Sequence, residues 1–194
     1  MGGILMGDYF DELKKAMDVL AENEKVIFIG QAVNYKGTAF YKTLEGVPEK
    51  RRLELPVFED VQMGMSIGLS LEGFIPVSFF PRMDFMVLGL NQLINHLDKM
   101  EEMSDGQFKP KVIIRTAKGS VKPLFPGPQH SQDHTEALKL MLKNVDVVKL
   151  ERKEDIVPAY KKALESHRST ILIEIPDLYH SENPHESHII PGSK

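Results

Sequence analysis

Short apolar runs that alternate with helix-length segments constrain the fold of this chain more than any other feature. Runs of this length without polar alternation are typical of strands buried on both faces of a sheet. The expected strands cover residues 26–29, 75–79, 111–115, 145–150 and 170–175, and the expected helices residues 8–23, 62–71, 84–103, 133–143 and 154–166. This alternation predicts an α/β fold, an open, doubly wound, mostly parallel sheet with helices on both faces.

One carboxylate has an unusual setting within the stretch LPVFEDVQMGMSIGLSLEGFIP, residues 55–76. Leu55 to Phe58 is expected to be a buried strand end, which would place Glu59 at a strand-to-helix junction. Burial there would raise the pKa of Glu59 unless a partner compensates. The alternative is structural, since Glu59 or Asp60 could simply stabilise free N–H groups in the first turn of the helix.

Composition excludes several classes of function. The chain has 24 Lys and Arg against 28 Asp and Glu, a net charge of −4, so no basic excess indicates a nucleic-acid surface. It has no cysteine, which removes thiolate nucleophiles and cysteine metal sites. No apolar run reaches the roughly 18 residues of a membrane span, and the start lacks a signal-peptide pattern. We therefore expect a cytoplasmic protein without nucleic-acid or membrane partners.

The loops after the predicted strands are the candidate site, because ligands of doubly wound sheets lie beyond the carboxyl ends of the strands. These loops follow Ile29, Phe58, Phe79, Arg115 and Leu150. They bring three residues into consideration, namely Glu59, Phe85 and His130.

Two of these candidates also have structural readings. Phe85 alone would be a core aromatic, and His130 could be a loop residue beside the helix that Asp133 and Glu136 are expected to start as a capping box. His130 and His134 lie four residues apart, yet no third ligand has a matching spacing, so a metal pair is disfavoured.

The two remaining segments have no strong periodicity. Gln31 to Lys50 is read as a long irregular connection with one helical turn, of the kind that tends to be functional or to meet a partner. The end of the chain, from Asp177, is expected to be an extended arm whose histidines are solvated. We predict one domain, residues 1–180, followed by a polar tail, residues 181–194.

The order of the segments resembles the pyrimidine-binding domain of thiamine-diphosphate enzymes. The similarity is closest to the beta subunit of the 2-oxoacid dehydrogenase first component and more distant to transketolase. It covers about residues 26–180, through the words IGQAV, KGTAF, LPVFEDVQMGMSIGLSLEGFIPV, FPRMDFMVLGLNQLINHLDKM, MSDGQ, VIIRTAKG, QHSQDHTEA and ILIEIPDLYH.

The resemblance assigns roles to the three candidates. The glutamate that hydrogen-bonds the cofactor's aminopyrimidine ring, and thereby favours its reactive imino tautomer, falls on Glu59. The aromatic residue that stacks on this ring falls on Phe85, and the histidine near the reacting carbons falls on His130. A carboxyl group in an enclosed setting suits its task, because low dielectric strengthens a shared hydrogen bond.

Departures from the family indicate a two-chain enzyme. The GDG word that holds the diphosphate through a divalent metal follows no predicted strand, so the resemblance implies that Mg²⁺ is held mainly by a diphosphate-binding, alpha-type partner in an α2β2 assembly. The contact surfaces expected are residues 31–50 and the helix at residues 84–103. An acidic pair usual after the first strand is Gln31-Ala32 here.

The family's carboxyl-terminal domain is also absent from the sequence, which weakens the expectation of docking to a dehydrogenase complex. The resulting expectation is a free-standing enzyme that decarboxylates a 2-oxoacid or cleaves a ketose and transfers the acyl or ketol unit. The alternatives are a non-catalytic interaction or regulatory protein with the same fold, and an unrelated nucleotide binder. The nucleotide binder is disfavoured because no Gly-rich phosphate loop follows Ile29.

Overall fold

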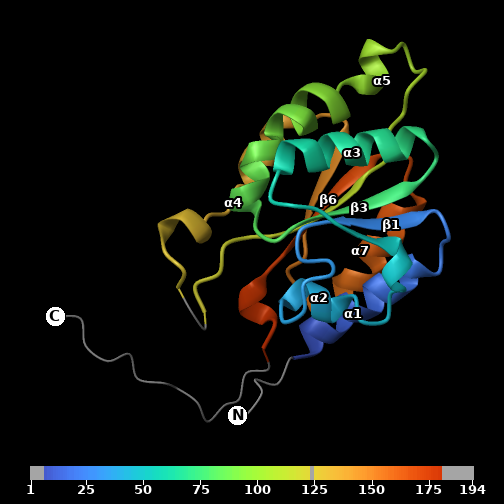
Figure 1. Cartoon of the computed structure of the whole chain (residues 1–194). Coiled ribbons are helices and arrows are strands. Elements are labelled where there is room, and N and C mark those ends of the chain that lie inside the picture. Colours follow the sequence, from blue (N-terminus) through green and yellow to red (C-terminus); the bar gives the residue numbers. More distant parts are fainter. Residues whose placement is uncertain (1–6, 123–124, 181–194) are drawn as a thin grey trace, which may run out of the picture.

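The computed structural model describes residues 7–122 and 125–180, which form one six-stranded sheet between two layers of helices (Figure 1). Every strand pairing is parallel and the strand order is β2-β1-β3-β4-β6-β5. The predicted α/β fold is therefore confirmed. The strands are β1 Val26–Gly30, β2 Arg52–Glu54, β3 Ile75–Phe80, β4 Ile113–Ala117, β5 Val145–Lys149 and β6 Ser169–Glu174.

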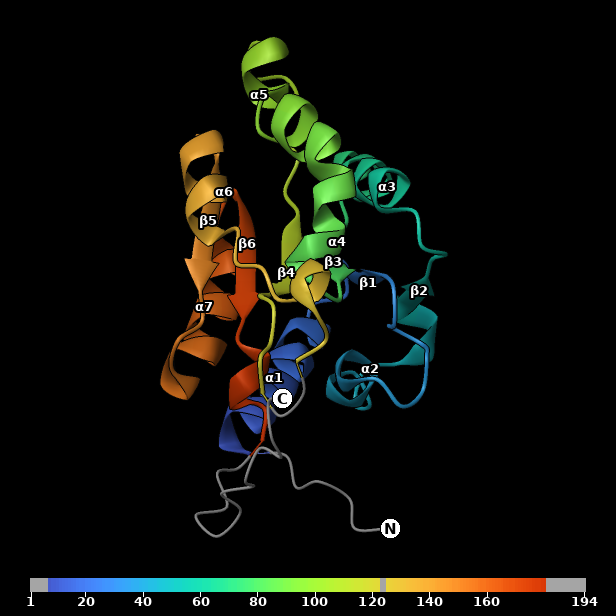
Figure 2. The ribbon, with the colours of Figure 1, turned by 90° about the vertical axis from the view of Figure 1, so that its left-hand side faces the viewer.

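The helices divide between the two faces of the sheet (Figures 1 and 2). One face packs on α1 Asp8–Ala21, α2 Ala39–Thr43 and α7 Lys153–Glu165. The other packs on α3 Glu59–Leu71, α4 Met83–Met86, the π-helical η3 Gln92–Leu97 and α6 Thr135–Met141. Shorter elements are α5 Met100–Met103 and the 3-10 turns η1 Glu49–Arg51, η2 Val87–Gly89, η4 Pro128–His130 and η5 Pro176–Leu178.

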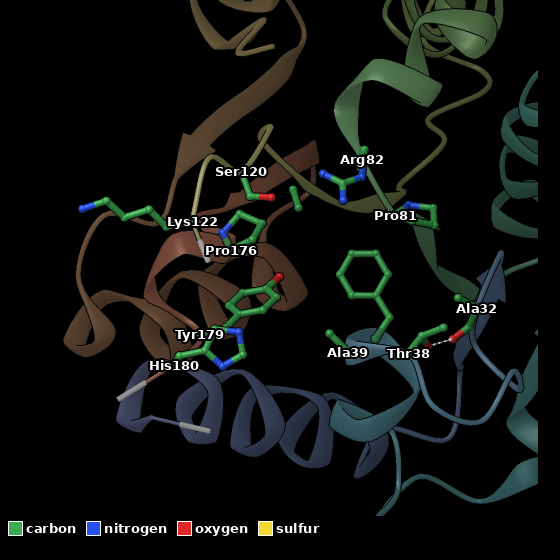
Figure 3. A pocket seen from close by; sticks show the side chains of 12 residues that line it. Ala32, Thr38, Ala39, Pro81, Arg82, Ser120, Lys122, Pro176, Tyr179 and His180 are labelled. Carbon is green, nitrogen blue, oxygen red and sulfur yellow. Dashed lines mark hydrogen bonds between the residues drawn. The ribbon is translucent and has the colours of Figure 1, made fainter. Parts of the chain in front are cut away.

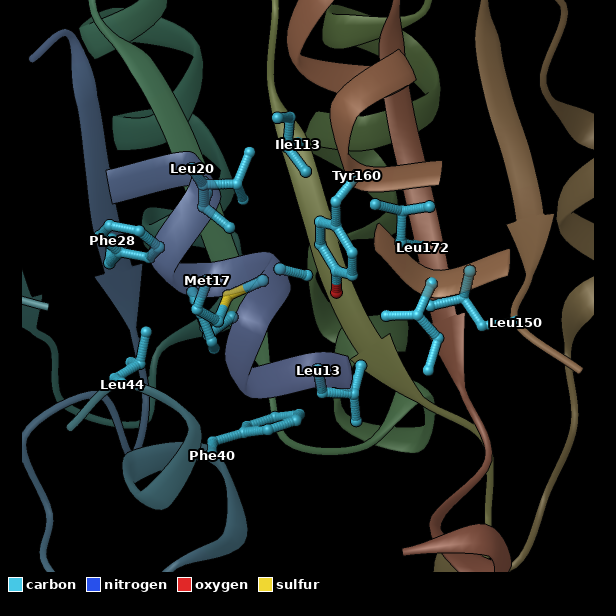
Figure 4. Packing of buried hydrophobic residues seen from close by; sticks show 14 of the residues in the cluster. Leu13, Met17, Leu20, Phe28, Phe40, Leu44, Ile113, Leu150, Tyr160 and Leu172 are labelled. Atoms are coloured by element: carbon cyan, nitrogen blue, oxygen red, sulfur yellow. The ribbon is translucent and has the colours of Figure 1, made fainter. Parts of the chain in front are cut away.

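Alternation along the strands separates the two cores. Ile113 belongs to the cluster under α1 and α7, whereas its neighbour Ile114 belongs to the cluster under α3 and α6. Successive side chains of a strand point to opposite faces, so each central strand needs apolar residues at consecutive positions. This is why the buried strands contain consecutive apolar residues. In the first cluster, Leu13, Met17 and Leu20 of α1 are wholly buried (Figure 4).

A buried polar cluster links β4, β6 and the segments above them. Arg115 and Glu174 are fully buried and form an ion pair. Tyr160 and Tyr179 donate their hydroxyls to Glu174, and Arg115 Nη1 donates to Thr43 Oγ1 at 2.7 Å. A buried charge is tolerated only when it is paired and its remaining hydrogen bonds are made. The cluster thus ties the first loop and the chain after β6 to the centre of the sheet.

The structure corrects the prediction of a buried strand before Glu59. The edge strand is β2, and the residues after it are in the open, with Val57 77% and Phe58 59% exposed. Edge strands are short and one-sided, so β2 lacks the apolar run that identifies central strands. Glu59 therefore begins its helix after an exposed linker rather than a strand.

The predicted helix over residues 84–103 is interrupted. It comprises α4, η2, η3 and α5, because the backbone changes from α to 3-10 and then to π hydrogen bonding. Gly89 is the last residue of η2, where a side chain would meet the start of α3: an added Cβ would lie 3.1 Å from the Glu59 carbonyl oxygen. Changes of helix type of this kind are common where a helix must fit a functional site.

The end of the chain also differs from the expected arm. Residues 176–178 form η5, and Tyr179 is buried against Tyr9 and Phe10 of α1. The buried Tyr179 side chain therefore anchors the end of the described chain to α1. The expected tail at residues 181–194 lies outside the described residues.

Within the described ranges, no helix combines the length and the apolar character needed to cross a membrane.

Candidate functional site

The first site loop leaves β1 through a glycine that no other residue can replace without strain. Gly30 has φ +138°, and an added Cβ would lie 2.5 Å from the Phe79 carbonyl oxygen and 2.6 Å from Gln62 Nε2. Gln62 Nε2 donates to the same carbonyl at 2.8 Å. The tight exit places Gln31 directly over the carboxyl end of the sheet, where it is 7% exposed.

Glu59 is a buried carboxylate with an amide partner. It is 2% exposed and lies in the first turn of α3, where a negative charge is favoured by the helix dipole. Its Oε1 accepts a hydrogen bond from Gln31 Nε2 at 3.1 Å. Phe58 occupies the N-cap position and no side chain makes a capping hydrogen bond there. Glu59 is thus turned toward the β1 loop, whereas Asp60 accepts from Gln92.

Phe85 lies at the start of the helical segment that packs on Glu59. It is half-buried in α4, one helical turn before Gly89, whose close approach to the Glu59 carbonyl is described above. The structure therefore places Phe85 shortly before the part of this segment that packs on the start of α3, and its role toward a cofactor stays a prediction.

His130 is brought against Phe85 from a distant part of the chain. Their ring centroids are 5.3 Å apart at 74°, an edge-to-face arrangement. His130 Nδ1 lies 2.8 Å from the Gln129 carbonyl oxygen. An Nδ1–H that donates to this carbonyl leaves Nε2 with the lone pair, the nitrogen that can accept a proton. The structure thus joins two of the three predicted site residues directly.

The predicted capping box after His130 is only partly formed. Asp133 Oδ1 accepts from the Thr135 N–H at 3.1 Å and Oδ2 from Lys149 at 2.7 Å. Burial acts against ionisation, but Lys149 and Thr135 outweigh it and lower the pKa of Asp133 to about 2. Glu136 does not reach back, because it pairs with Lys139 instead. The helix also ends at Met141, before the expected Lys143.

A cavity of about 270 Å³ opens beside these loops, at the carboxyl ends of β1, β3, β4 and β6. Figure 3 shows Pro81 and Arg82 on one side and Ser120, Pro176 and Tyr179 on the other, while the Lys122 ammonium points away. The position agrees with the rule that ligands of such sheets lie beyond the carboxyl ends of the strands.

No group of three or more His, Cys, Asp or Glu side chains suited to a metal occurs in the part of the chain that the structure describes. The segment of His134 contacts α4, since the backbone N–H of His134 donates to Met83 Sδ, and the His130 ring faces Phe85.

Sequence reasoning missed three residues that the structure places around the site. Gln31 was noted only for the charge it lacks, yet it holds Glu59. Arg82 donates to the His130 carbonyl and Asp84 accepts from Gln132. A usable signal was present for these two, since both are charged and precede Phe85 within the PRMDF word that follows a buried strand.

Comparison with known proteins identifies relatives over almost the whole chain. The chain is 29% identical over 192 residues to the pyruvate dehydrogenase E1 component subunit beta of Gracilaria tenuistipitata var. liui, covering 95% of this chain and 58% of the relative. It is 31% identical over 180 residues to the mitochondrial subunit beta of Ascaris suum, covering 90% and 48%. The chain thus spans about half the length of the curated relatives it matches.

A solved structure has the same fold. It is described as a split gene transketolase, inactive beta4 tetramer, and superposes with a TM-score of 0.67 at 21% identity, covering 88% of this chain and 51% of that one. No protein-family model matches the chain. The relatives confirm the resemblance to beta subunits of the 2-oxoacid dehydrogenase first component.

Proposed function

We propose that this homologue of pyruvate dehydrogenase E1 beta subunits is the pyrimidine-binding component of a thiamine-diphosphate-dependent enzyme. The observation that carries the proposal is the buried Glu59 carboxyl group, which accepts a hydrogen bond from Gln31 at the carboxyl end of the sheet. Phe85 and His130 contact each other at the same end of the sheet. Among the described residues, the partner of this buried carboxyl group is an amide and not a cation, a setting that costs free energy and is common at functional sites.

The residues fit one half of this cofactor. An aminopyrimidine ring presents a nitrogen that can share a proton and a flat face that can stack. Glu59 would hold the ring nitrogen through its carboxyl group, and Gln31 would keep that carboxyl oriented. The half-buried ring of Phe85 would pack on the face. When bound, thiamine diphosphate supplies the carbanion chemistry, and the protein supplies position and electrostatics.

His130 would serve the substrate side of the site. Its Nδ1 faces a carbonyl of its own loop, so Nε2 is free to accept or return a proton. Contact with Phe85 fixes the imidazole next to the residue assigned to the cofactor. We assign to His130 the binding of substrate or the transfer of a proton near the reacting carbon.

The proposed partner is a diphosphate-binding, alpha-type chain in an α2β2 assembly, and Mg²⁺ would be held mainly by that chain. The proposed substrate is a 2-oxoacid or a ketose, whose acyl or ketol unit is passed to an acceptor. The exposed residues just before Glu59, Val57 and Phe58, add a surface for this partner that the sequence did not suggest.

The test is titration of thiamine diphosphate and Mg²⁺ into the chain alone and into the chain mixed with the product of the neighbouring gene. We expect tight binding only by the mixture. Tight binding by the isolated chain, or no binding by the mixture, contradicts the proposal. The second result would favour a non-catalytic protein that keeps the fold.

A matched pair of variants tests Glu59 itself. Glu59→Gln should lower turnover of the assembled enzyme by at least about 10²-fold, the usual scale for a lost acid–base group. Asp60→Asn changes the neighbouring acid, which faces Gln92 instead, and should stay within about threefold of wild type. Near-normal turnover of Glu59→Gln would remove this residue from the mechanism.

A further inference from the structure

The loop that carries His130 is held by alternate residues of the PRMDF word, residues 81–85. Arg82 Nη1 donates to the His130 carbonyl oxygen at 3.0 Å. Asp84 Oδ1 accepts from Gln132 Nε2 at 2.9 Å. Phe85 then contacts the imidazole itself. Three residues at the start of the helical segment after β3 thus contact the loop at His130 and at Gln132.

The opposite side of the loop is confined as well. The Gly119 N–H donates to the Gln132 carbonyl at 2.8 Å, and a Cβ added to Gly119 would lie 2.1 Å from Ser131 Cα. The segment after β4 therefore leaves no room for the loop to move away from α4. The His130 loop is fixed between Gly119 and the two charged residues.

The two charged residues are placed to act together on this loop. Arg82 also lines the cavity, so the same side chain contacts both the cavity and the His130 backbone. Asp84 Oδ2 is buried and has no hydrogen-bond partner among the described residues, so its interaction with Gln132 is its one protein contact of this kind. A partly buried carboxylate with a single acceptor bond is costly to the fold, which argues for a role in the site.

We propose that Arg82 and Asp84 are positioning residues that set the place of His130 against Phe85. The catalytic meaning of this placement rests on the proposed function. The placement itself is a property of the isolated chain, so it can be tested without cofactor or partner.

The experiment measures two properties of the isolated chain by NMR. The first is the ring-proton shift of His130, which the edge-to-face contact with Phe85 displaces; the variant Phe85→Leu gives the value without that contact. The second is amide hydrogen exchange over residues 127–133. Arg82→Gln should move the His130 shift toward the Phe85→Leu value and speed exchange about tenfold, the scale of one lost hydrogen bond to a charged group.

Further variants separate the pair's action from general destabilisation. Arg82→Lys keeps a cationic donor and should recover part of the wild-type shift. Gln132→Ala removes the exposed partner of Asp84 and should speed loop exchange in the same way. Arg152→Gln removes an exposed arginine that pairs with Asp155, outside this loop, and should change neither property.

The proposal is overturned if Arg82→Gln and Gln132→Ala both leave the His130 shift unchanged and loop exchange within twofold of wild type. If Arg82→Gln abolishes slow exchange in β3 and β4, the variant is unfolded and Gln132→Ala alone decides. In the assembled enzyme, Arg82→Gln should lower kcat without weakening cofactor binding. A displaced His130 with unchanged kcat would contradict the role given to His130, not its positioning.

Discussion

The buried pair Arg115 and Glu174 gives the sharpest prediction of stability. Glu174→Gln keeps the shape of the side chain, but Tyr160 and Tyr179 donate to different oxygens of Glu174 and the amide can accept at only one of these two positions. It leaves the Arg115 guanidinium buried without a countercharge. The rings of Phe40 and Phe79, with centroids 4.6 and 5.0 Å from Arg115 Cζ, and the Thr43 hydroxyl would remain beside it, and none of them is an anion.

The expected cost follows from the complete burial of both partners. Breaking a buried ion pair from one side costs about 3–5 kcal/mol, since the remaining charge loses its countercharge without regaining water. For a chain of this size, that cost lowers Tm by about 6–20 °C. The free energy of unfolding is measured by urea denaturation, with Tm from circular dichroism.

An exposed pair of the same chemistry provides the control. Arg152 and Asp155 lie at 2.8 Å with side chains 71% and 45% exposed, so Asp155→Asn should cost less than about 1 kcal/mol. Arg115→Met combined with Glu174→Gln should cost about 2–3 kcal/mol less than the sum of the single variants, because no unpaired charge remains. A Glu174→Gln cost as small as that of Asp155→Asn would refute this account of the cluster.

Three further predictions concern pH and backbone. Burial, followed by the charge of Glu174, raises the pKa of three tyrosines, Tyr9, Tyr160 and Tyr179. Tyrosine in the unfolded chain ionises near pH 10, while these three stay neutral in the folded chain. The free energy of unfolding should therefore fall above about pH 10 by up to about 4 kcal/mol per pH unit for the three groups together. An unfolding free energy that stays flat from pH 10 to 11 would contradict this. Lys149→Met should raise the pKa of Asp133 from about 2 toward its ordinary value, and NMR titration of the carboxyl group checks this. The variant should cost less than about 1 kcal/mol of unfolding free energy at pH 7, since the ion pair is partly exposed. In the wild-type chain, the stability that the low pKa of Asp133 contributes should be lost as pH falls from about 4 to 2. Gly30→Ala should cost at least about 2 kcal/mol of unfolding free energy in urea denaturation, because it combines a positive φ with overlap on the Phe79 carbonyl. The control Gly37→Ala, at φ +97° with open space around it, should cost about 1 kcal/mol. Equal costs would show that the overlap does not matter.

Residue chemistry and local spacing singled out the three candidate residues, and the roles that the resemblance gives them stay predictions. Glu59 could be singled out because an acidic residue is unusual between an apolar run and a helix whose small residues allow close packing. Phe85 and His130 were found because they follow strands whose apolar runs are unmistakable. The contact between these two was not predictable, since they lie 45 positions apart in the sequence. No local pattern encodes the distance of 5.3 Å between their ring centroids.

The sequence misled where short elements depend on their neighbours. Leu55 to Phe58 reads as a buried strand, but β1 already has its parallel neighbour in β2, three residues of mixed polarity. The helix after β3 reads as continuous, but the start of α3 presses on Gly89 and the hydrogen-bonding pattern changes there. In both cases packing against another element outweighed local preference.

The sequence by itself determined that this chain alternates strands and helices around a parallel sheet, because burial on both faces imposes apolar runs that no other architecture requires. The tertiary structure alone decided which polar groups are partners: Gln31 with Glu59, Arg115 with Glu174, Arg82 with the His130 carbonyl. The periodicity of a segment indicates which of its residues face the core and which face solvent. Hydrogen bonds between distant loops depend on strand order and register, which are set only when the whole sheet assembles.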